Sequence, residues 1–239
     1  MSVINGSIQA LRYLPVILMN NGIELLTMHR WGLMGPESPW AWEKCKDKIL
    51  SLRGRKGFPD ADVLSFLRIS VSLSDGKVMD EFTGVQLKRR WKKVVYALLY
   101  YYSSSPDVKE AGRFVDFRKL PGGYAFAKAF SHRVIQPLVD MLKENPEHVR
   151  EAMMALGGEA MPYGDFSFKV RTLPHIPVLL VFWVADDEFP AHATMLFDEN
   201  VTQHIPTEMV AILGELLRKR IWDVRKIIET LPGAEVFRL

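Results

Sequence analysis

The spacing of apolar and polar residues changes several times along this chain of 239 residues, and each pattern predicts a different element. Apolar residues alternate with polar ones over residues 67–73, which is typical of a half-buried strand, and Ser74-Asp75-Gly76-Lys77 is a hairpin-turn signal. Over residues 87–102 the apolar residues follow a helical period, and Ser103-Ser104-Ser105-Pro106 predicts the end of that helix. The first half of the chain therefore contains a hairpin followed by an amphipathic helix.

The second half mixes helices and strands in the same way. Apolar residues over 126–141 have helical spacing, and Pro137 is expected to kink or divide this helix. Asn145-Pro146 predicts the start of another helix and Gly157-Gly158 its end. Residues 166–170 alternate like a half-exposed strand, and the apolar residues 178–184 predict a strand buried on both faces. Finally, Pro206-Thr207-Glu208 opens a long C-terminal helix that Leu231-Pro232-Gly233 ends.

This order of elements predicts an α+β fold. We expect a single compact domain over residues 46–239, with a mixed or antiparallel sheet packed with helices and a long C-terminal helix. Residues 1–45 form a predicted N-terminal appendage, because residues 31–42 place three tryptophans among glycine and proline. A protein partner could bind through this aromatic segment.

Composition narrows the class of protein. The apolar content of 48% and the net charge of +3 are ordinary for a soluble globular protein, and we expect no membrane interaction and a cytoplasmic location. Cys45 is the single cysteine, which excludes an internal disulfide and an iron–sulfur cluster held by four thiolates of this chain. Neighbouring lysines would make an exposed Cys45 reactive, whereas a small half-buried residue on a helix is the simpler interpretation.

Three carboxylates follow the apolar strand and mark the first candidate site. Asp186, Asp187 and Glu188 precede Phe189-Pro190, and a loop that ends a buried strand is a common position for a functional site. Asp187 and Glu188 are candidate catalytic acid–base residues, because a carboxylate near aromatic residues can have a raised pKa. Structural ion pairs are the alternative interpretation.

A pair of glycines ahead of a helix marks the second candidate site. Gly122 and Gly123, followed by Tyr124, would let a ligand approach backbone N–H groups, although a plain tight turn is the simpler and favoured explanation of such a pair. Arg133, farther along the same helix, is a candidate anion anchor. We expect residues 121–124 and 186–190 to line one pocket, with Asp198 among its ligand-binding residues.

A basic block offers a different function. Lys88, Arg89, Arg90, Lys92 and Lys93 surround Trp91, so this segment could hold the phosphates of RNA while the tryptophan stacks on a base. The alternative is a solvated helix face, with Trp91 in the apolar core.

Metal and cofactor signals are weak. His192, Asp198 and His204 could contribute to a metal site, but no compact histidine motif supports one, so we assign no metal and leave the cofactor unknown. No nucleophile elbow, Walker motif or dinucleotide fingerprint is present in the sequence either.

An ordered series of short motifs resembles a known family. The segments FVDFRKLPGGYAF, ALGG, GDFSF, LPHIP, DDEFPA and LFDEN occur in this order, and residues 45–220 are similar to the uncharacterised domain-of-unknown-function family DUF3786. The resemblance implies an origin in archaea or anaerobic bacteria. Some members carry an additional iron–sulfur domain, for which this chain lacks the cysteines. The positions that match the family are Pro121, Gly122, Gly123, Tyr124, Arg133, Asp165, Pro174, Asp187, Glu188, Phe189, Pro190, Phe197 and Asp198.

Three functions follow from these observations. The first is binding, with or without chemical conversion, of a small anionic or tetrapyrrole-like metabolite in an archaeal or anaerobic pathway. The second is association with RNA or the ribosome through the basic block. The third is a non-catalytic role in a larger complex. The first is favoured, because the most distinctive residues lie away from the basic block.

Overall fold

A computed structural model describes residues 38–230. The predicted N-terminal segment up to residue 37 and the predicted end of the last helix, Leu231-Pro232-Gly233, lie outside these residues. Residues 39–230 belong to one compact unit. The division of the chain at residue 45 stays a prediction.

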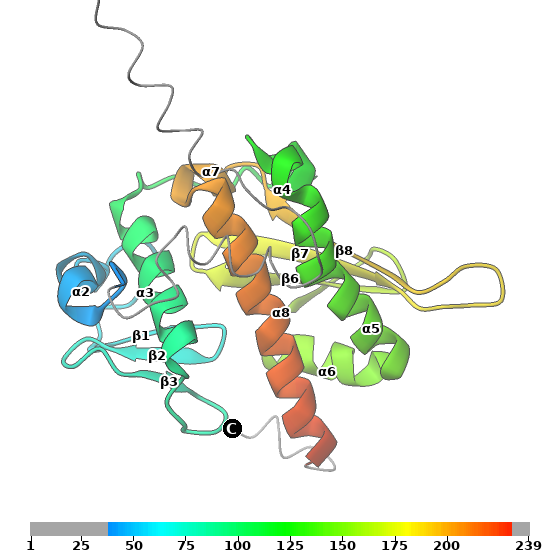
Figure 1. Ribbon diagram of the computed structural model, residues 1–239, viewed down its shortest axis with the longest axis horizontal. Helices are drawn as coiled ribbons and strands as arrows, with labels where there is room; N and C mark the ends of the chain where they lie inside the picture. The colour runs from blue at the N-terminus through cyan, green and yellow to red at the C-terminus, as the bar shows by residue number, and fades with distance from the viewer. Residues whose placement is uncertain (1–37, 231–239) are drawn as a thin grey trace, which may run out of the picture. The chain divides into compact units, whose positions relative to one another are not determined.

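The described residues form short runs of strands separated by runs of helices (Figure 1). The α-helices are α2 (Trp42–Leu50), α3 (Arg89–Ser104), α4 (Gly123–Phe130), α5 (Gln136–Glu144), α6 (Pro146–Ala155), α7 (Val201–His204) and α8 (Thr207–Thr230). A 3-10 turn, η2 (Phe117–Lys119), and a π-helical turn, η3 (Ser131–Ile135), lie next to α4. The strands are β1 (Val63–Phe66), β2 (Ile69–Ser72), β3 (Val78–Asp80), β4 (Phe114–Asp116), β5 (Glu159–Met161), β6 (Phe166–Leu173), β7 (Ile176–Trp183) and β8 (His192–Asp198).

The strands form two antiparallel sheets. One has the order β1-β2-β3 and the other β4-β8-β7-β6-β5. With helices packed around them and the long α8 near the C-terminus, the chain has the predicted α+β fold.

The small sheet confirms the predicted hairpin and shortens its first strand. Ser72 and Lys77 close the turn between β2 and β3, where Gly76 has a φ of 70°. Leu67 and Arg68 were expected in the strand but form the tight turn between β1 and β2, with φ values of 49° and 56°. The alternation was misleading because Leu67, although in the turn, still points into the core.

The large sheet places its most apolar strand, β7, between β6 and β8. Its residues up to Phe182 are buried, as predicted, whereas Trp183 and Val184 are exposed. β6 is more buried than its sequence indicated. One reason is that the Ser167 hydroxyl donates to Met161 O and accepts from Tyr163 N–H. These hydrogen bonds allow the polar Ser167 side chain to be buried.

Helices α4, α5 and α8 pack in front of the large sheet (Figure 1). Phe130 of α4 contacts Phe197 of β8, with ring centroids 5.9 Å apart. Gly214 of α8 permits the close approach of this layer, because a Cβ there would lie 2.7 Å from the Phe130 ring. The predicted kink at Pro137 takes the form of the π turn η3, in which Gln136 N–H donates to Ser131 O.

Helix boundaries follow local signals. Asn145 caps α6 by accepting the His148 N–H at 3.1 Å, and α3 ends at Ser104 ahead of Pro106. Among residues 38–230, no helix combines the length and the apolar character that crossing a membrane requires.

Candidate functional site: an arginine cluster around Glu215

The two predicted loops do not come together. Residues 121–124 lie at the start of α4, where Pro121 O accepts the Thr207 hydroxyl at 2.7 Å, and residues 186–190 form the tip of the β7–β8 hairpin. Figure 1 shows that tip projecting away from the start of α4. The expectation of one shared pocket is therefore wrong. The expectation treated the loop after a buried strand as part of a site on the body of the domain, whereas this antiparallel hairpin carries its loop out beyond the neighbouring strands.

The paired glycines have structural roles. Gly122 adopts a left-handed conformation with φ 74° at the N-cap of α4, which is unfavourable for other residues. A Cβ on Gly123 would collide with Phe117 O. Tyr124 is 82% exposed. Within the described part of the chain, Gly122, Gly123 and Tyr124 therefore do not line a ligand pocket.

The acidic tip is exposed, and Asp186 organises it. The Asp186 side chain accepts the N–H groups of Glu188 and Phe189 at 2.9 and 2.7 Å, and these bonds hold the pKa of its carboxyl below the ordinary value. Asp187, Glu188 and Phe189 point into solvent. No nearby group of the described chain prepares Asp187 or Glu188 for acid–base catalysis.

Asp198 is buried and has a structural role. Its carboxylate accepts the backbone N–H groups of Ala111, Gly112 and Asn200 at 2.8 to 3.0 Å. Asp198 therefore joins the loop before β4 to the end of β8. Both of its carboxylate oxygen atoms already accept hydrogen bonds from the protein backbone.

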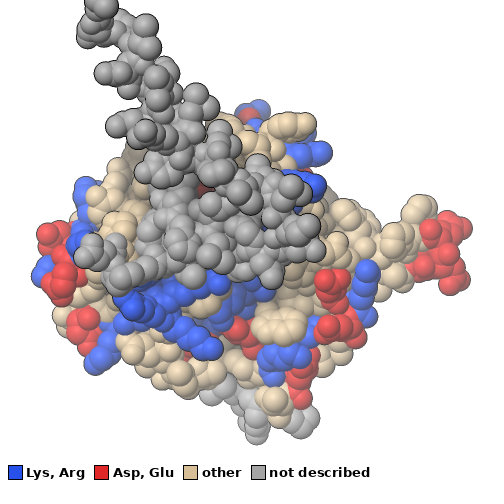
Figure 2. Space-filling view, in the orientation of Figure 1, with Lys and Arg blue, Asp and Glu red and all other residues tan. Residues whose placement is uncertain are grey.

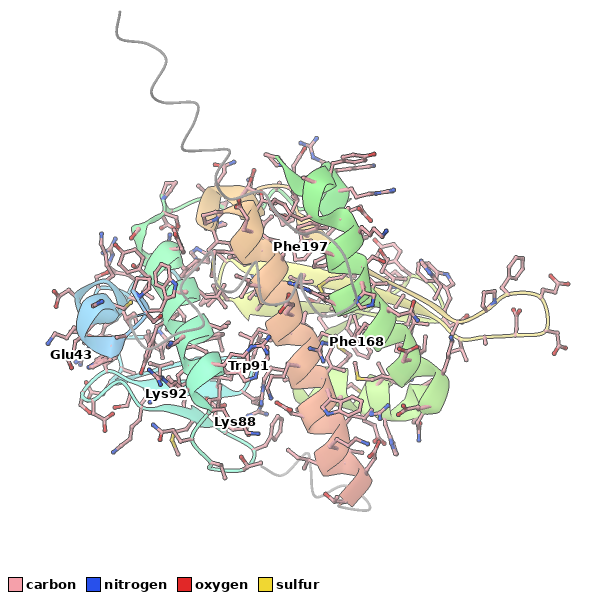
Figure 3. All side chains as sticks on the ribbon, in the orientation of Figure 1. Glu43, Lys88, Trp91, Lys92, Phe168 and Phe197 are labelled. Carbon is pink, nitrogen blue, oxygen red and sulfur yellow. The ribbon has the colours of Figure 1, made fainter. Side chains whose placement is uncertain are left out.

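The basic block divides between surface and interior (Figure 3). Lys88 and Arg89 are exposed and Lys92 is half-buried, whereas Lys93 is buried and its pKa is lowered by that burial. Trp91 lies between α3 and α8 and is only 9% exposed, which agrees with its assignment to the core. Arg90 and Lys219 stack over its ring, with the Arg90 Cζ at 5.2 Å and the Lys219 Nζ at 5.5 Å from the centroid.

Arg133 faces a buried carboxylate that the sequence reading overlooked. The π turn η3 carries Arg133, whose Nη1 donates to Glu215 Oε1 of α8 at 3.1 Å. Burial raises the pKa of Glu215, while the charge of Arg133 acts in the opposite direction. The sequence does contain a sign that Glu215 is buried, because it is the only charged residue in the apolar run between Met209 and Leu217.

Arg90 approaches the same carboxylate from another helix, and Arg218 adds positive charge from the same helix as Glu215. Arg90 of α3 places its Nη2 4.0 Å from Glu215 Oε2, and the charge of Arg218, three residues on in α8, also lowers the pKa of Glu215. The Nη2 of Arg133 is buried and has no hydrogen-bond partner among residues 38–230. Arg90, Arg133 and Arg218 are called the arginine cluster below. Within the described chain, Arg133 and Arg90 place guanidinium groups at one buried carboxylate and the positive charge of Arg218 acts on it as well, an arrangement suited to an anion.

A second polar cluster surrounds Tyr102. The buried Lys56 ammonium donates to the carbonyls of Tyr102, Ser105 and Pro106, and the Tyr102 hydroxyl donates back to Lys56 O at 2.8 Å. His204 is buried 5.8 Å from the Tyr102 ring, and neither ring nitrogen of His204 has a hydrogen-bond partner in the described part of the chain. Because its donors are satisfied by these carbonyls, the lysine links the loop before β1 to the end of α3.

The described residues around Cys45, His192, Asp198 and His204 form neither a reactive-cysteine site nor a metal site. Cys45 is buried on α2, and burial raises the pKa of its thiol to about 11, so the reactive interpretation is wrong. His192 is exposed, far along β8 from Asp198. Residues 38–230 contain no group of three or more His, Cys, Asp or Glu side chains arranged to hold a metal ion.

Comparison with known proteins identifies the family. Residues 61–220 match the sequence profile of the family described as Domain of unknown function (DUF3786). The chain belongs to this family. The DUF3786 match spans the fold from the start of the small sheet to Arg220, and so includes the arginine cluster and the hairpin tip. No curated protein and no solved structure matches the chain.

Proposed function

We propose that this DUF3786 protein binds a small anionic metabolite at the arginine cluster. The observation that carries the proposal is that Arg90 of α3 and Arg133 of η3 both place guanidinium groups at Glu215 of α8. A guanidinium group presents several donors in one plane and stays charged at every physiological pH, which suits carboxylate and phosphate ligands.

The geometry gives Arg133 the central role. The ion pair with Glu215 fixes the position of its guanidinium group. The buried Nη2 has no hydrogen-bond acceptor among residues 38–230, so it could donate a hydrogen bond to a ligand. π turns recur at functional sites, because the extra residue redirects side chains that a regular helix would orient elsewhere. Basic side chains gather over α3 and the neighbouring part of α8, which supports attraction of an anion to this face (Figure 2).

The class of ligand follows from the charge. A ligand with two or more carboxylates or phosphates would match the cluster better than a monoanion, and a tetrapyrrole carboxylate is one candidate. We place this function in the cytoplasm of an archaeon or an anaerobic bacterium, on the strength of the family resemblance and the single cysteine. Asp187 and Glu188 have no part in the proposal, because they lie at the hairpin tip.

The test is native mass spectrometry together with absorption spectroscopy on protein purified anaerobically from its source. We expect a retained anionic metabolite or pigment that is lost in an Arg133→Gln variant. Arg113→Gln is the matched control, because Arg113 is exposed and pairs with Glu199 away from the cluster. Equal retention by both variants would place the ligand elsewhere.

RNA binding is a second candidate, favoured by the basic surface of Figure 2. Lys88 and Lys92 make no ion pair with any residue in the range 38–230. Because Trp91 is buried, the binding would rest on phosphate contacts and should fall steeply with salt. A filter-binding assay at several salt concentrations tests this candidate. The parent protein should bind RNA and the Lys88→Glu, Arg89→Glu, Lys92→Glu variant should not. Absent or salt-insensitive binding by the parent protein would dismiss RNA binding.

A further inference from the structure

The β7–β8 hairpin extends beyond the rest of the large sheet as an arm, defined here as residues 183–192. Trp183 and His192 are the last paired residues of the two strands, with rings 5.3 Å apart. The base of the arm is held by Asp165, whose carboxylate accepts the Val184 N–H at 2.7 Å. In Figure 1 the arm reaches past α5 and α6 at the right-hand side.

The arm presents an apolar surface to solvent. Phe189 is 67% exposed, Trp183 and Val184 are exposed as well, and Tyr163 lies exposed in the adjoining turn. This turn packs against the arm, because a Cβ on Gly164 would lie 3.3 Å from Trp183 Cε2. Tyr163 and Trp183 therefore lie on adjoining segments, and Phe189 is exposed nearer the tip; exposed aromatic residues of this kind are enriched at protein–protein interfaces.

The arm also has a fixed shape and a defined charge. Asp186 N–H donates to Phe189 O at 3.0 Å, which closes the turn at the tip. Asp187 and Glu188 are exposed beside Phe189 and make no ion pair with any residue that the structure describes. Figure 2 shows the acidic side chains gathered at this tip. A partner surface should therefore combine apolar contacts with positive charge.

The start of α3 offers such a surface on the same chain. Val85 is 63% exposed, and Lys88 and Lys92 follow it on the outer side of α3 (Figure 3). Val85, Lys88 and Lys92 are called the α3 patch. The arm and the α3 patch lie on opposite sides of the compact unit in Figure 1, so the arm of one molecule cannot reach its own patch.

We infer that the arm of one copy of this protein docks on the α3 patch of a second copy. Phe189 and Trp183 contact the apolar part of the patch, while Asp187 and Glu188 pair with Lys88 and Lys92. Because the two surfaces differ, the contact is head-to-tail and joins successive copies rather than closing a symmetric dimer. An arm of this size buries a small interface, so the association is weak and depends on concentration and salt.

Sedimentation velocity over a concentration series from micromolar to several hundred micromolar tests this inference. For the parent protein we expect a weight-average mass that rises with concentration beyond the dimer and falls when salt is added. An arm variant, Asp187→Lys with Glu188→Lys, and a patch variant, Lys88→Glu with Lys92→Glu, should each remain monomeric. An equimolar mixture of the two variants should associate again, because each reversed arm then faces a reversed patch.

The controls separate this contact from general charge effects and from misfolding. Glu147→Lys reverses an exposed charge on α6 and should leave the association unchanged, whereas Phe189→Ser should weaken it with no change in charge. Thermal unfolding checks that every variant is folded. A parent protein that stays monomeric throughout, or a mixture of variants that fails to associate, would overturn the inference. Association that depends on the arm but not on the patch would also overturn it.

Discussion

Arg220 shows how one residue can determine a turn that has no glycine. It is buried on α8, and it donates to Leu67 O at 3.1 Å and to Arg68 O at 3.2 Å, the carbonyls of the two residues with positive φ. It also forms an ion pair with Asp80 at the end of β3. The guanidinium group therefore holds the left-handed turn of the small sheet and joins that sheet to α8.

Removing this group should strongly destabilise the protein. Arg220→Met keeps much of the side-chain volume but removes the guanidinium group that pairs with Asp80 and donates to the two turn carbonyls, which should lower the free energy of unfolding by about 3–5 kcal/mol. Arg113→Gln breaks an exposed pair instead and should lower it by no more than about 1 kcal/mol. Chemical denaturation of both variants checks the difference, and similar values for the two would show that Arg220 contributes no more than a surface charge.

His204 should make stability depend on pH. Burial first, and then the nearby charges of Lys56 and His175, lower the pKa of His204, while Asp198 and Asp107 oppose this effect. In the unfolded chain the imidazole takes up a proton below about pH 6.5, whereas in the folded protein it stays neutral to a lower pH. The unfolded state thus binds more protons in this window, and stability is lost as the pH falls below about 6.5.

The measurement is the free energy of unfolding between pH 7.5 and pH 5. The parent protein should lose stability toward acid by up to about 1.4 kcal/mol per pH unit more steeply than His204→Gln. His132→Gln, which removes an exposed histidine of η3, is the control and should follow the parent. Parallel curves for the parent and His204→Gln would contradict the assignment.

At the scale of elements, Gly76 links the β2–β3 hairpin to α2. Its φ is 70°, and a Cβ at this position would collide with the Trp42 ring. Gly84 has a similar φ of 65° but no atom within 4 Å of the added Cβ. A substitution at Gly84 therefore reports the backbone strain alone.

Gly76→Ala should accordingly destabilise the protein more than Gly84→Ala. We expect the difference to be about 1–3 kcal/mol, the range for overpacking a filled core. Thermal or chemical unfolding of the two variants measures it directly. Equal losses would mean that the contact between the hairpin and α2 yields without energetic consequence.

Element type and most element positions could be predicted from the sequence, because they depend on local periodicity. The α3 stripe, the α6 cap at Asn145 and the buried run of β7 were all confirmed. The turn at Leu67-Arg68 was not predictable, since its left-handed conformation depends on Arg220, far along the chain.

The candidate site could be predicted only in part, for the same reason. Arg133 was singled out, but its neighbours Arg90 and Glu215 come from elements that only the tertiary fold brings together.

At the scale of the whole molecule, two charged surfaces of the described chain stand out in the view of Figure 2. Basic residues gather over α3 and α8, with the arginine cluster between these helices and η3, and acidic residues gather at the tip of the arm. The arginine cluster is proposed to bind an anion, whereas the acidic arm is proposed to dock on Lys88 and Lys92 of a second copy. The two proposals use different residues, so variants at Arg133 and at Glu188 can be judged independently.

The central claim is that the arginine cluster binds an anion, and isothermal titration calorimetry tests it most directly. The probes are inorganic pyrophosphate and coproporphyrin, a tetrapyrrole tetracarboxylate, each titrated into the parent protein, Arg133→Gln and Arg113→Gln. We predict that at least one probe binds the parent and Arg113→Gln equally, and that Arg133→Gln weakens binding by at least about tenfold, because a hydrogen bond to a charged group contributes about 1.5–3 kcal/mol. Equal affinity in all three proteins, or no binding of either probe, would contradict the account.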